Sequence, residues 1–336
     1  MGNILVTGGA GYIGSHVSKQ LSDSGRSLVV LDDLSKGFRD AARFGELVVG
    51  ETGDQALVSR VLKEYDIETV MHFAAWTVVP DSVAFPLKYY HNNTASTRNL
   101  LECCIDGGVK HFIFSSTAAV YGTPEGGVCA EDTPKDPINP YGQSKLMSEL
   151  MLRDACNVND MRYVVLRYFN VAGSDPSGRV GQSTINGTLL LKVAVEAAMG
   201  LRESMSIFGT DYPTPDGTGI RDYIHVEDLA DAHLKALDYL GQGGESTTLN
   251  CGYGHGYSVR EVLDMVGRVH GSPLTIKEGP RRAGDPAQLI ARAERIREVL
   301  GWRPQYDDLE TIVRTSLAWE QKLQELRRAG QWQPES

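Results

Sequence analysis

A tyrosine and a lysine four positions apart, Tyr141 and Lys145, are the first residues whose types and spacing could do chemistry. On a helix, side chains at this spacing share one face and lie one turn apart. A phenol with a reference pKa of about 10 is a poor base at neutral pH, but a neighbouring ammonium group favours its ionised form. The hydroxyl run Ser115, Ser116 and Thr117 ends a predicted strand upstream. This combination predicts an active site in which Tyr141 is the general base.

A glycine-rich segment near the N-terminus could hold a pyrophosphate. Residues 7–14 read TGGAGYIG, follow a predicted strand over 3–7 and open a predicted helix over 12–24. Glycines let the backbone approach a pyrophosphate closely, and the helix N-terminus offers unpaired N–H groups and a partial positive charge. Asp32 follows 18 residues after Gly14, where a carboxylate can accept hydrogen bonds from the ribose of an adenosine. Since this carboxylate would repel a 2′-phosphate, the sequence favours NAD over NADP.

The elements that must position these groups alternate along the first half of the chain. Short runs rich in Val, Ile and Leu separate longer amphipathic stretches, a pattern typical of βαβ units on a parallel sheet. After about residue 170, prolines and glycines punctuate shorter elements, which indicates a smaller lobe with long loops. Strands are expected over 3–7, 27–31, 46–49, 68–73, 110–115 and 162–168, and helices over 12–24, 55–65, 86–106 and 140–157.

The fold class expected is therefore α/β: a Rossmann-type doubly wound parallel sheet with a smaller C-terminal α/β substrate lobe. We expect the nucleotide-binding domain over residues 1–170, to which parts of the later chain could return, and the substrate lobe over residues 171–330.

Composition narrows the class of partner. The chain has 336 residues, a length typical of about two domains, and a net charge of -10, which argues against nucleic acid or an anionic membrane as partner. The five cysteines form no C-x-x-C or other metal-binding spacing, so we expect a reducing cytoplasm and no metal. No apolar run reaches the roughly 18 residues of a membrane span.

The motifs together resemble the extended short-chain dehydrogenase/reductase superfamily and, within it, the UDP-galactose 4-epimerases (UDP-glucose 4-epimerases). The resemblance covers nearly the whole chain, and its longest motif, at 211–226, reads DYPTPDGTGIRDYIHV. It implies a tightly held NAD that takes a hydride from sugar C4 while Tyr141 removes the C4 hydroxyl proton, with no net redox change. The resembling segments are 8–16, 72–75, 114–122, 141–145, 166–170 and 211–226.

The resemblance also implies the roles of individual residues. Tyr141, Lys145 and Thr117 would be catalytic, with Thr117 hydrogen-bonded to the sugar hydroxyl. The cofactor would contact Gly8, Gly11, Tyr12, Ile13, Gly14, Asp32, Asp33, Asp54, Gln55, Phe73, Ala74, Ala75, Asn92, Ser115, Lys145 and Tyr168. The UDP-sugar would contact Thr117, Tyr141, Phe169, Asn170, Phe208, Arg221, Arg282, Asp285 and Leu289. An arginine guanidinium pairs bidentately with a diphosphate, which fits this set.

Some positions depart from the usual pattern of this family. Thr117 stands where Ser is usual, and Thr77 where many members carry a lysine that contacts the cofactor. Leu189 lies where Asn or His often meets the nucleotide, and Arg292 where Asp is usual. Leu289 matches a position beside the sugar C2 substituent, where a bulky tyrosine excludes N-acetyl sugars. These departures bear on nucleotide affinity and sugar scope.

Other functions stay open at this point. The epimerase could act on another UDP-sugar, such as a UDP-N-acetylhexosamine, UDP-pentose or UDP-uronate, and a nucleotide-sugar reductase would use the same Tyr and Lys. A 4,6-dehydratase needs an acid/base pair directly after Thr117. Because this chain has Ala118 and Ala119 there, the sequence disfavours a dehydratase. A regulator that only senses NAD has no need of the three catalytic residues. The resemblance also implies a homodimer, formed through the helices near 86–106 and 140–157.

Overall fold

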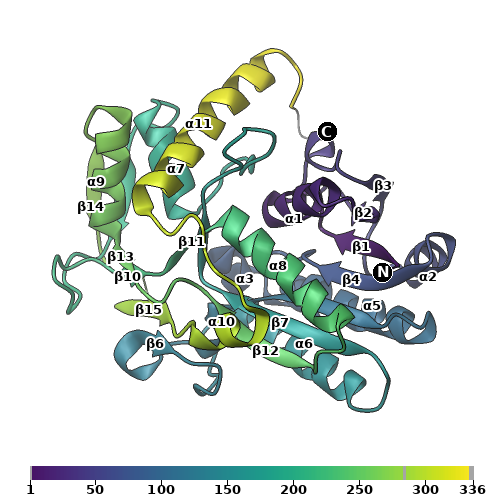
Figure 1. The fold of residues 1–336 in the computed structure, drawn as a ribbon. Coiled ribbons are helices and arrows are strands. Elements are labelled where there is room, and N and C mark those ends of the chain that lie inside the picture. The colour runs from purple at the N-terminus through teal and green to yellow at the C-terminus, as the bar shows by residue number, and fades with distance from the viewer. Residues whose placement is uncertain (1, 283–284, 333–336) are drawn as a thin grey trace.

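The computed structural model describes residues 2–282 and 285–332, and its centre is a seven-stranded sheet in which every neighbouring pair is parallel (Figure 1). Strands β2 and β3 lie on one side of β1, and β4, β5, β7 and β12 lie on the other. This doubly wound order leaves a crevice at the carboxyl ends of β1 and β4, where ligands bind in such sheets. The predicted Rossmann-type fold is confirmed. In spatial order the strands are β12 (Thr247–Cys251), β7 (Arg162–Tyr168), β5 (His111–Thr117), β4 (Ile67–His72), β1 (Asn3–Thr7), β2 (Leu28–Asp32) and β3 (Glu46–Val49).

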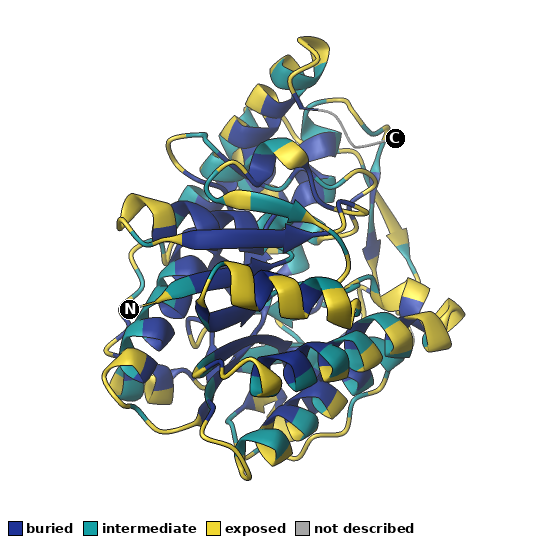
Figure 2. Ribbon diagram, turned by 90° about the vertical axis from the view of Figure 1, so that its right-hand side faces the viewer, coloured by how far each residue is buried: buried dark blue, intermediate teal, exposed yellow. Residues whose placement is uncertain are grey.

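Helices cover both faces of the sheet because successive side chains of a strand point to opposite faces. In β1, Ile4 and Val6 belong to the core beneath α1 and α8, whereas Leu5 belongs to the core beneath α2, α5 and α6. The central strands are buried, and the exposed residues of the covering helices lie on their outer sides (Figure 2). The bounds of these helices are Tyr12–Asp23 (α1), Gln55–Glu64 (α2), Ser96–Asp106 (α5), Pro140–Cys156 (α6) and Val226–Gly241 (α8).

A second group of elements, built from the later chain apart from one short strand, extends beyond the carboxyl ends of the strands (Figure 1). Its helices are α7 (Leu190–Ala198), α9 (Val259–His270) and α11 (Leu309–Arg328), while α10 (Glu294–Leu300) packs on α8 and β12. One small sheet has the order β13 (Tyr257–Ser258), β10 (Ile220–Arg221), β15 (Gln288–Ala291) and β6 (Val128–Cys129). Two separate two-stranded parallel sheets also belong to this group: β8 (Asn170–Ala172) with β11 (Tyr223–His225), and β9 (Met205–Phe208) with β14 (Ile276–Gly279).

One predicted element is wrong. In place of a single helix over 86–106 the chain forms α4 (Pro86–Tyr89), a π-helical turn over Tyr90–Ala95 and then α5, preceded by α3 (Val79–Ala84). The wider turn directs the Asn93 side chain inward, where it binds the backbone N–H and C=O of Trp76 at 2.8 and 2.9 Å. The other predicted strands and helices agree with the structure to within two residues at each end. The domain boundary at residue 170 stays a prediction, and α8 and β12 lie on the central sheet although they come after it.

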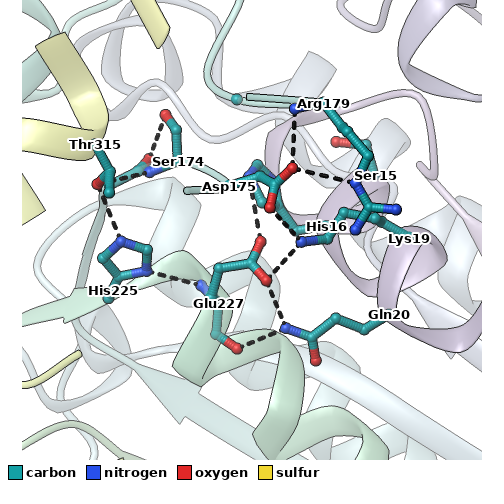
Figure 3. A network of polar contacts seen from close by, with 12 residues as sticks. Ser15, His16, Lys19, Gln20, Ser174, Asp175, Arg179, His225, Glu227 and Thr315 are labelled. Carbon is teal, nitrogen blue, oxygen red and sulfur yellow. Dashed lines mark hydrogen bonds and ion pairs between the residues drawn. The ribbon is translucent and has the colours of Figure 1, made fainter. Parts of the chain in front are cut away.

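A buried network of charged groups joins α1 to the later chain (Figure 3). The Lys19 ammonium donates to Asp175 at 2.8 Å and to Glu227 at 2.7 Å, and all three side chains are buried. Arg179 in turn binds Asp23 on the surface of α1 at 2.6 Å. A buried cation with two carboxylate partners avoids the cost of an unpaired charge. The network therefore holds the first helix of the sheet against α8 and the segment after β8.

Buried neutral histidines predict that the protein loses stability in mild acid. Burial lowers the pKa of His72 and His225 to about 3 and that of His233 to about 4. Between pH 6.5 and 5 the unfolded chain therefore binds protons that the folded chain does not, so stability falls as the pH falls. With an unfolded pKa of about 6.5, each such histidine contributes about 2 kcal/mol of loss at pH 5. Urea unfolding at pH 7 and pH 5 measures this, and an unchanged free energy of unfolding would contradict the prediction. In His233→Asn the difference between the two pH values shrinks.

Candidate active site

The turn between β1 and α1 packs its glycines against the segment that follows β4. Gly8 has a φ of +69°, and a Cβ atom there would lie 2.6 Å from the backbone nitrogen of Ala74. A Cβ atom on Gly14 would lie 2.3 Å from the carbonyl oxygen of Gly8. A side chain at either position would force the turn open. The glycines therefore keep the carboxyl ends of β1 and β4 together at the crevice.

Helix α1 begins at this turn without a side chain over its N-terminus. Its N-cap is Gly11, which has no side chain, and the Tyr12 hydroxyl donates instead to the Gly173 carbonyl at 2.6 Å. The first N–H groups of a helix, here including those of Tyr12 and Ile13, have no partner within the helix and carry a partial positive charge. Such a bare N-terminus beside close-packed glycines fits the pyrophosphate of a dinucleotide.

The carboxylate of Asp32 is held in place at the end of β2. It is buried and accepts from the backbone N–H of Ala10 at 2.9 Å and of Leu34 at 2.8 Å. Burial raises the pKa of Asp32, and these two hydrogen bonds oppose the rise. Each carboxylate oxygen keeps a second lone pair, so the group can still accept from a ribose hydroxyl.

Three further predicted cofactor contacts are exposed, one directly after β2 and two at the start of α2. Asp33 accepts from the backbone and hydroxyl of Ser35, and Asp54 caps α2 by accepting from the N–H of Leu57 at 3.0 Å. Gln55 donates to Glu102 at 2.6 Å. The side chains of these three residues are thus engaged within the chain, and their contact with a cofactor stays a prediction.

The strand ends nearest the crevice carry the remaining predicted cofactor contacts. Ser115 on β5 and Tyr168 on β7 are joined by a hydrogen bond between their hydroxyls. The segment Phe73–Ala75 continues β4, with the Phe73 N–H donating to Thr7 at 3.0 Å, and Asn92 lies in the π-helical turn beside it, bound to the side chain of Asn93 at 3.0 Å. Ser115, Tyr168 and Phe73–Ala75 thus lie at the carboxyl ends of neighbouring strands, and their contact with a cofactor stays a prediction.

Thr117 and Tyr141 are brought together although they lie on different elements. Thr117 ends β5, while α6 begins at Pro140 behind the N-cap Asn139, whose side chain accepts from the Gly142 N–H at 2.9 Å. Burial raises the pKa of Tyr141, and its hydrogen bond with the Thr117 hydroxyl lowers it. A phenol and an alcohol placed in this way could both hydrogen-bond to one hydroxyl group of a substrate.

Lys145 lies one turn further along α6 and is only 2% exposed. Its ammonium nitrogen lies 4.6 Å from the centre of the Phe114 ring, which attracts a cation. Burial lowers the pKa of Lys145 to about 7, and the charge of Glu149 opposes the shift. The ammonium is thus held in a buried site one helical turn from Tyr141, whose ionisation a nearby cation would favour.

The predicted nucleotide contacts of the later chain form a polar edge around β10. Arg221 forms an ion pair with Asp285. Asp222 is buried and accepts from the backbone N–H of Tyr253 and of Gly254, both at 3.0 Å. The Arg282 guanidinium lies 4.0 Å from the centre of the Phe208 ring. An arginine and an exposed ring of this kind can hold a diphosphate and a flat base.

Three further predicted contacts lie where the central sheet meets this edge. The backbone N–H of Asn170 donates to the carbonyl of Asp222 at 3.0 Å. Phe169 is buried in the main core. Leu289 on β15 is half-buried and lies opposite Arg221 of β10.

Sequence reasoning missed three residues that support this site: Asn93, Glu149 and Arg167. Asn93 fixes the backbone at Trp76, and the buried ion pair between Glu149 and Arg167 lies behind Lys145 and Thr117. A sequence signal existed for one of them, because Glu149 follows Lys145 by four positions on the same helix. Across residues 2–282 and 285–332, no cluster of His, Cys, Asp or Glu could hold a metal ion, and no helix is long and apolar enough to cross a membrane.

This fold and site define a class of nucleotide-dependent enzymes, and the chain belongs to the NAD dependent epimerase/dehydratase family, whose sequence model matches residues 4–252. Within that class it belongs to the UDP-glucose 4-epimerases.

Individual relatives show how close this relationship is. The chain is 55% identical to the UDP-glucose 4-epimerase of Azospirillum brasilense over 96% of this chain and 93% of that protein. The crystal structure of the UDP-glucose 4-epimerase from Brucella ovis in complex with NAD has a TM-score of 0.92 at 43% identity, covering 95% of this chain and 98% of that one. The UDP-Glc/GlcNAc 4-epimerase of Campylobacter jejuni has a TM-score of 0.84 at 47% identity, covering 96% and 100%.

Proposed function

We propose that the protein interconverts UDP-glucose and UDP-galactose with NAD as its resident cofactor, as an enzyme of galactose metabolism. The observation that carries the proposal is that Thr117 at the end of β5, Tyr141 at the start of α6 and the buried Lys145 one turn further along α6 meet at the crevice where the glycine turn lies. The names of the relatives agree with this activity.

Each residue of the proposed site has its own role in the epimerisation. Bound NAD supplies a hydride acceptor at sugar C4 and later a hydride donor. Tyr141, as phenolate, removes the proton of the C4 hydroxyl and afterwards returns it. Thr117 keeps that hydroxyl aligned with Tyr141, and the positive charge of Lys145 favours the phenolate. Arg221 and Arg282 hold the diphosphate, which leaves the sugar to turn within the site.

The test is to incubate the purified protein with UDP-galactose and no added NAD. UDP-glucose should appear with no net formation of NADH. A reductase would instead need a stoichiometric supply of NADH, so a strict dependence on added nucleotide would refute the proposal. Loss of water from the sugar would indicate a dehydratase.

The second substrate class concerns the sugar C2 substituent. We infer that Leu289 borders it and leaves room for an N-acetyl group, and the name of the Campylobacter relative agrees with such a dual scope. Leu289→Tyr should therefore lower kcat/KM for UDP-N-acetylglucosamine relative to UDP-glucose by roughly 10- to 200-fold, the range of a marginal steric fit. The measurement is kcat/KM for both sugars in both proteins. An unchanged ratio would show that Leu289 does not border the substituent.

A homodimer is the proposed assembly, and exposed apolar side chains support it. Val83, Phe85 and Leu87 are 63%, 54% and 80% exposed, and they lie on or beside α3 and α4, which pack against α6. Met147 and Leu150 of α6 are exposed as well. A second copy would cover this surface through its own α6. Analytical ultracentrifugation should give a dimer for the wild type and a monomer for Leu87→Asp.

The free state of all five cysteines agrees with a cytoplasmic enzyme.

A further inference from the structure

Glu149 is a buried carboxylate that the proposed chemistry does not use. It lies on α6 one turn after Lys145 and is 6% exposed. Its oxygens accept from the Ser116 hydroxyl and from Arg167, whose Nε lies at 2.9 Å and whose Nη2 lies at 2.5 Å. A buried carboxylate lowers the stability of the fold unless its partners compensate for the lost hydration. The residues that Ser116 and Arg167 contact therefore indicate what this carboxylate holds in place.

The two partners of Glu149 sit beside the proposed active-site hydroxyls. Ser116 stands between Ser115 and Thr117 on β5, and Arg167 precedes Tyr168 on β7. In the sheet register Ser116 pairs with Arg167, and Thr117 pairs with Tyr168. One carboxylate on the helix of Tyr141 and Lys145 is therefore bonded to both strands that carry the hydroxyl groups of the site.

Arg167 is itself fixed from the opposite side. It donates to the Tyr121 hydroxyl at 2.9 Å and to the Glu131 carbonyl at 3.2 Å, and Tyr121 donates to Asn250 on β12 at 2.7 Å. The guanidinium thus satisfies Glu149 and the loop after Thr117 together. The carboxylate oxygens of Glu149 accept hydrogen bonds from Arg167 and Ser116 and not from Lys145. The Lys145 ammonium can therefore bind Tyr141 and the cofactor, while the negative charge of Glu149 still attracts it.

The charged and titratable groups around Lys145 leave Glu149 as the main negative neighbour. From β4 comes His72, whose pKa burial lowers to about 3, so it is neutral near pH 7. From β5 comes the uncharged Phe114 ring, and α6 itself contributes Tyr141 and Glu149. Behind Glu149 lie the cations Arg167 and Lys135, both of which interact with that carboxylate.

We propose that Glu149 is a positioning residue for the epimerisation: its carboxylate ties α6 to the ends of β5 and β7, and its negative charge acts on the Lys145 ammonium one helical turn away. This inference rests on the proposed function. The charge acts through Lys145 on Tyr141, and Glu149 itself contacts neither sugar nor cofactor.

The experiment compares Glu149→Gln, Glu149→Asp and the double variant Glu149→Gln with Arg167→Gln, each loaded with NAD. Glutamine keeps the size and the hydrogen-bonding oxygen but loses the charge. We expect the alkaline limb of the kcat profile, where Lys145 loses its proton, to move down by about one pH unit in Glu149→Gln. Glu149→Asp keeps the charge and should leave the limb near its wild-type position even where kcat falls. The double variant removes the uncompensated Arg167 charge and should move the limb part of the way back.

A purely structural role predicts a different outcome. It lowers kcat in all three variants without moving the limb, and it makes the double variant no better than the single one. A folded Glu149→Gln protein with an unmoved limb, or an Asp variant that moves as far as the Gln variant, would overturn the proposal. The ¹³C signal of the Lys145 Cε, followed against pH in lysine-labelled protein, reports the same titration without turnover. This readout tests the Glu149 inference without relying on activity. Failure of the proposed function would instead appear as wild-type inactivity toward both UDP-hexoses.

Discussion

Replacing Tyr141 by phenylalanine lowers kcat for epimerisation by about 100- to 10,000-fold, the usual cost of losing a general base. The substitution removes one oxygen atom. The ring still fills its place at the start of α6, and Thr117 keeps its own hydrogen bond with the Ala119 N–H at 3.1 Å. The glycine turn and Asp32, which are expected to hold the cofactor, are untouched, so NAD should stay bound.

The measurement combines turnover of UDP-galactose with the absorbance of protein-bound nucleotide after gel filtration. Tyr65→Phe is the matched control, because it removes a tyrosine hydroxyl at the surface, where Tyr65 donates to Glu46 at 2.6 Å. Near-normal turnover in a folded, NAD-loaded Tyr141→Phe protein would remove Tyr141 from the role of base. A loss of activity with loss of NAD would instead place the tyrosine in cofactor binding.

The parts of the fold that sequence could predict are those with a local physical cause. Val, Ile and Leu runs such as the one in β1 must be buried on both faces, which requires a parallel sheet covered by helices. The glycines at 8 and 14 are needed because a Cβ atom at either would meet backbone. The spacing of Tyr141 and Lys145 is fixed by the helix period once the helix begins behind Asn139. Apart from the contact between Gly8 and Ala74, none of these needs knowledge of a distant partner.

The parts that sequence could not predict depend on partners far along the chain. The strand over 247–251 has no pattern that selects β7 as its neighbour, and only the assembled core decides that pairing. Glu149 and Arg167, 18 residues apart, look like two solvated charges until α6 packs against β5 and β7 and brings them together. The π-helical turn places Asn93 against the backbone of Trp76, a contact that the spacing of apolar residues does not predict. The support of the site was therefore harder to predict than its reactive groups.

Lys145→Ala should lower kcat by at least about 100-fold and also weaken the retention of NAD. Without the ammonium, the pKa of Tyr141, which burial already raises, rises further, so less of the phenolate base exists at pH 7. The remaining activity should accordingly increase toward alkaline pH, in the region where the wild type declines as Lys145 loses its proton.

Stability should not account for that loss. Burial lowers the pKa of Lys145 from its usual 10.5 to about 7, so between these values the unfolded chain binds a proton that the folded chain does not. The charged lysine therefore destabilises the fold at neutral pH, and its removal relieves that cost. Unfolding in urea checks this point for Lys145→Ala. Lys145→Arg, which keeps a cation but changes its shape and reach, is the matched control and should retain the acid side of the pH profile better than Lys145→Ala. If Lys145→Ala binds NAD as tightly as the wild type and shows an unmoved pH profile, the lysine neither holds the cofactor nor assists Tyr141.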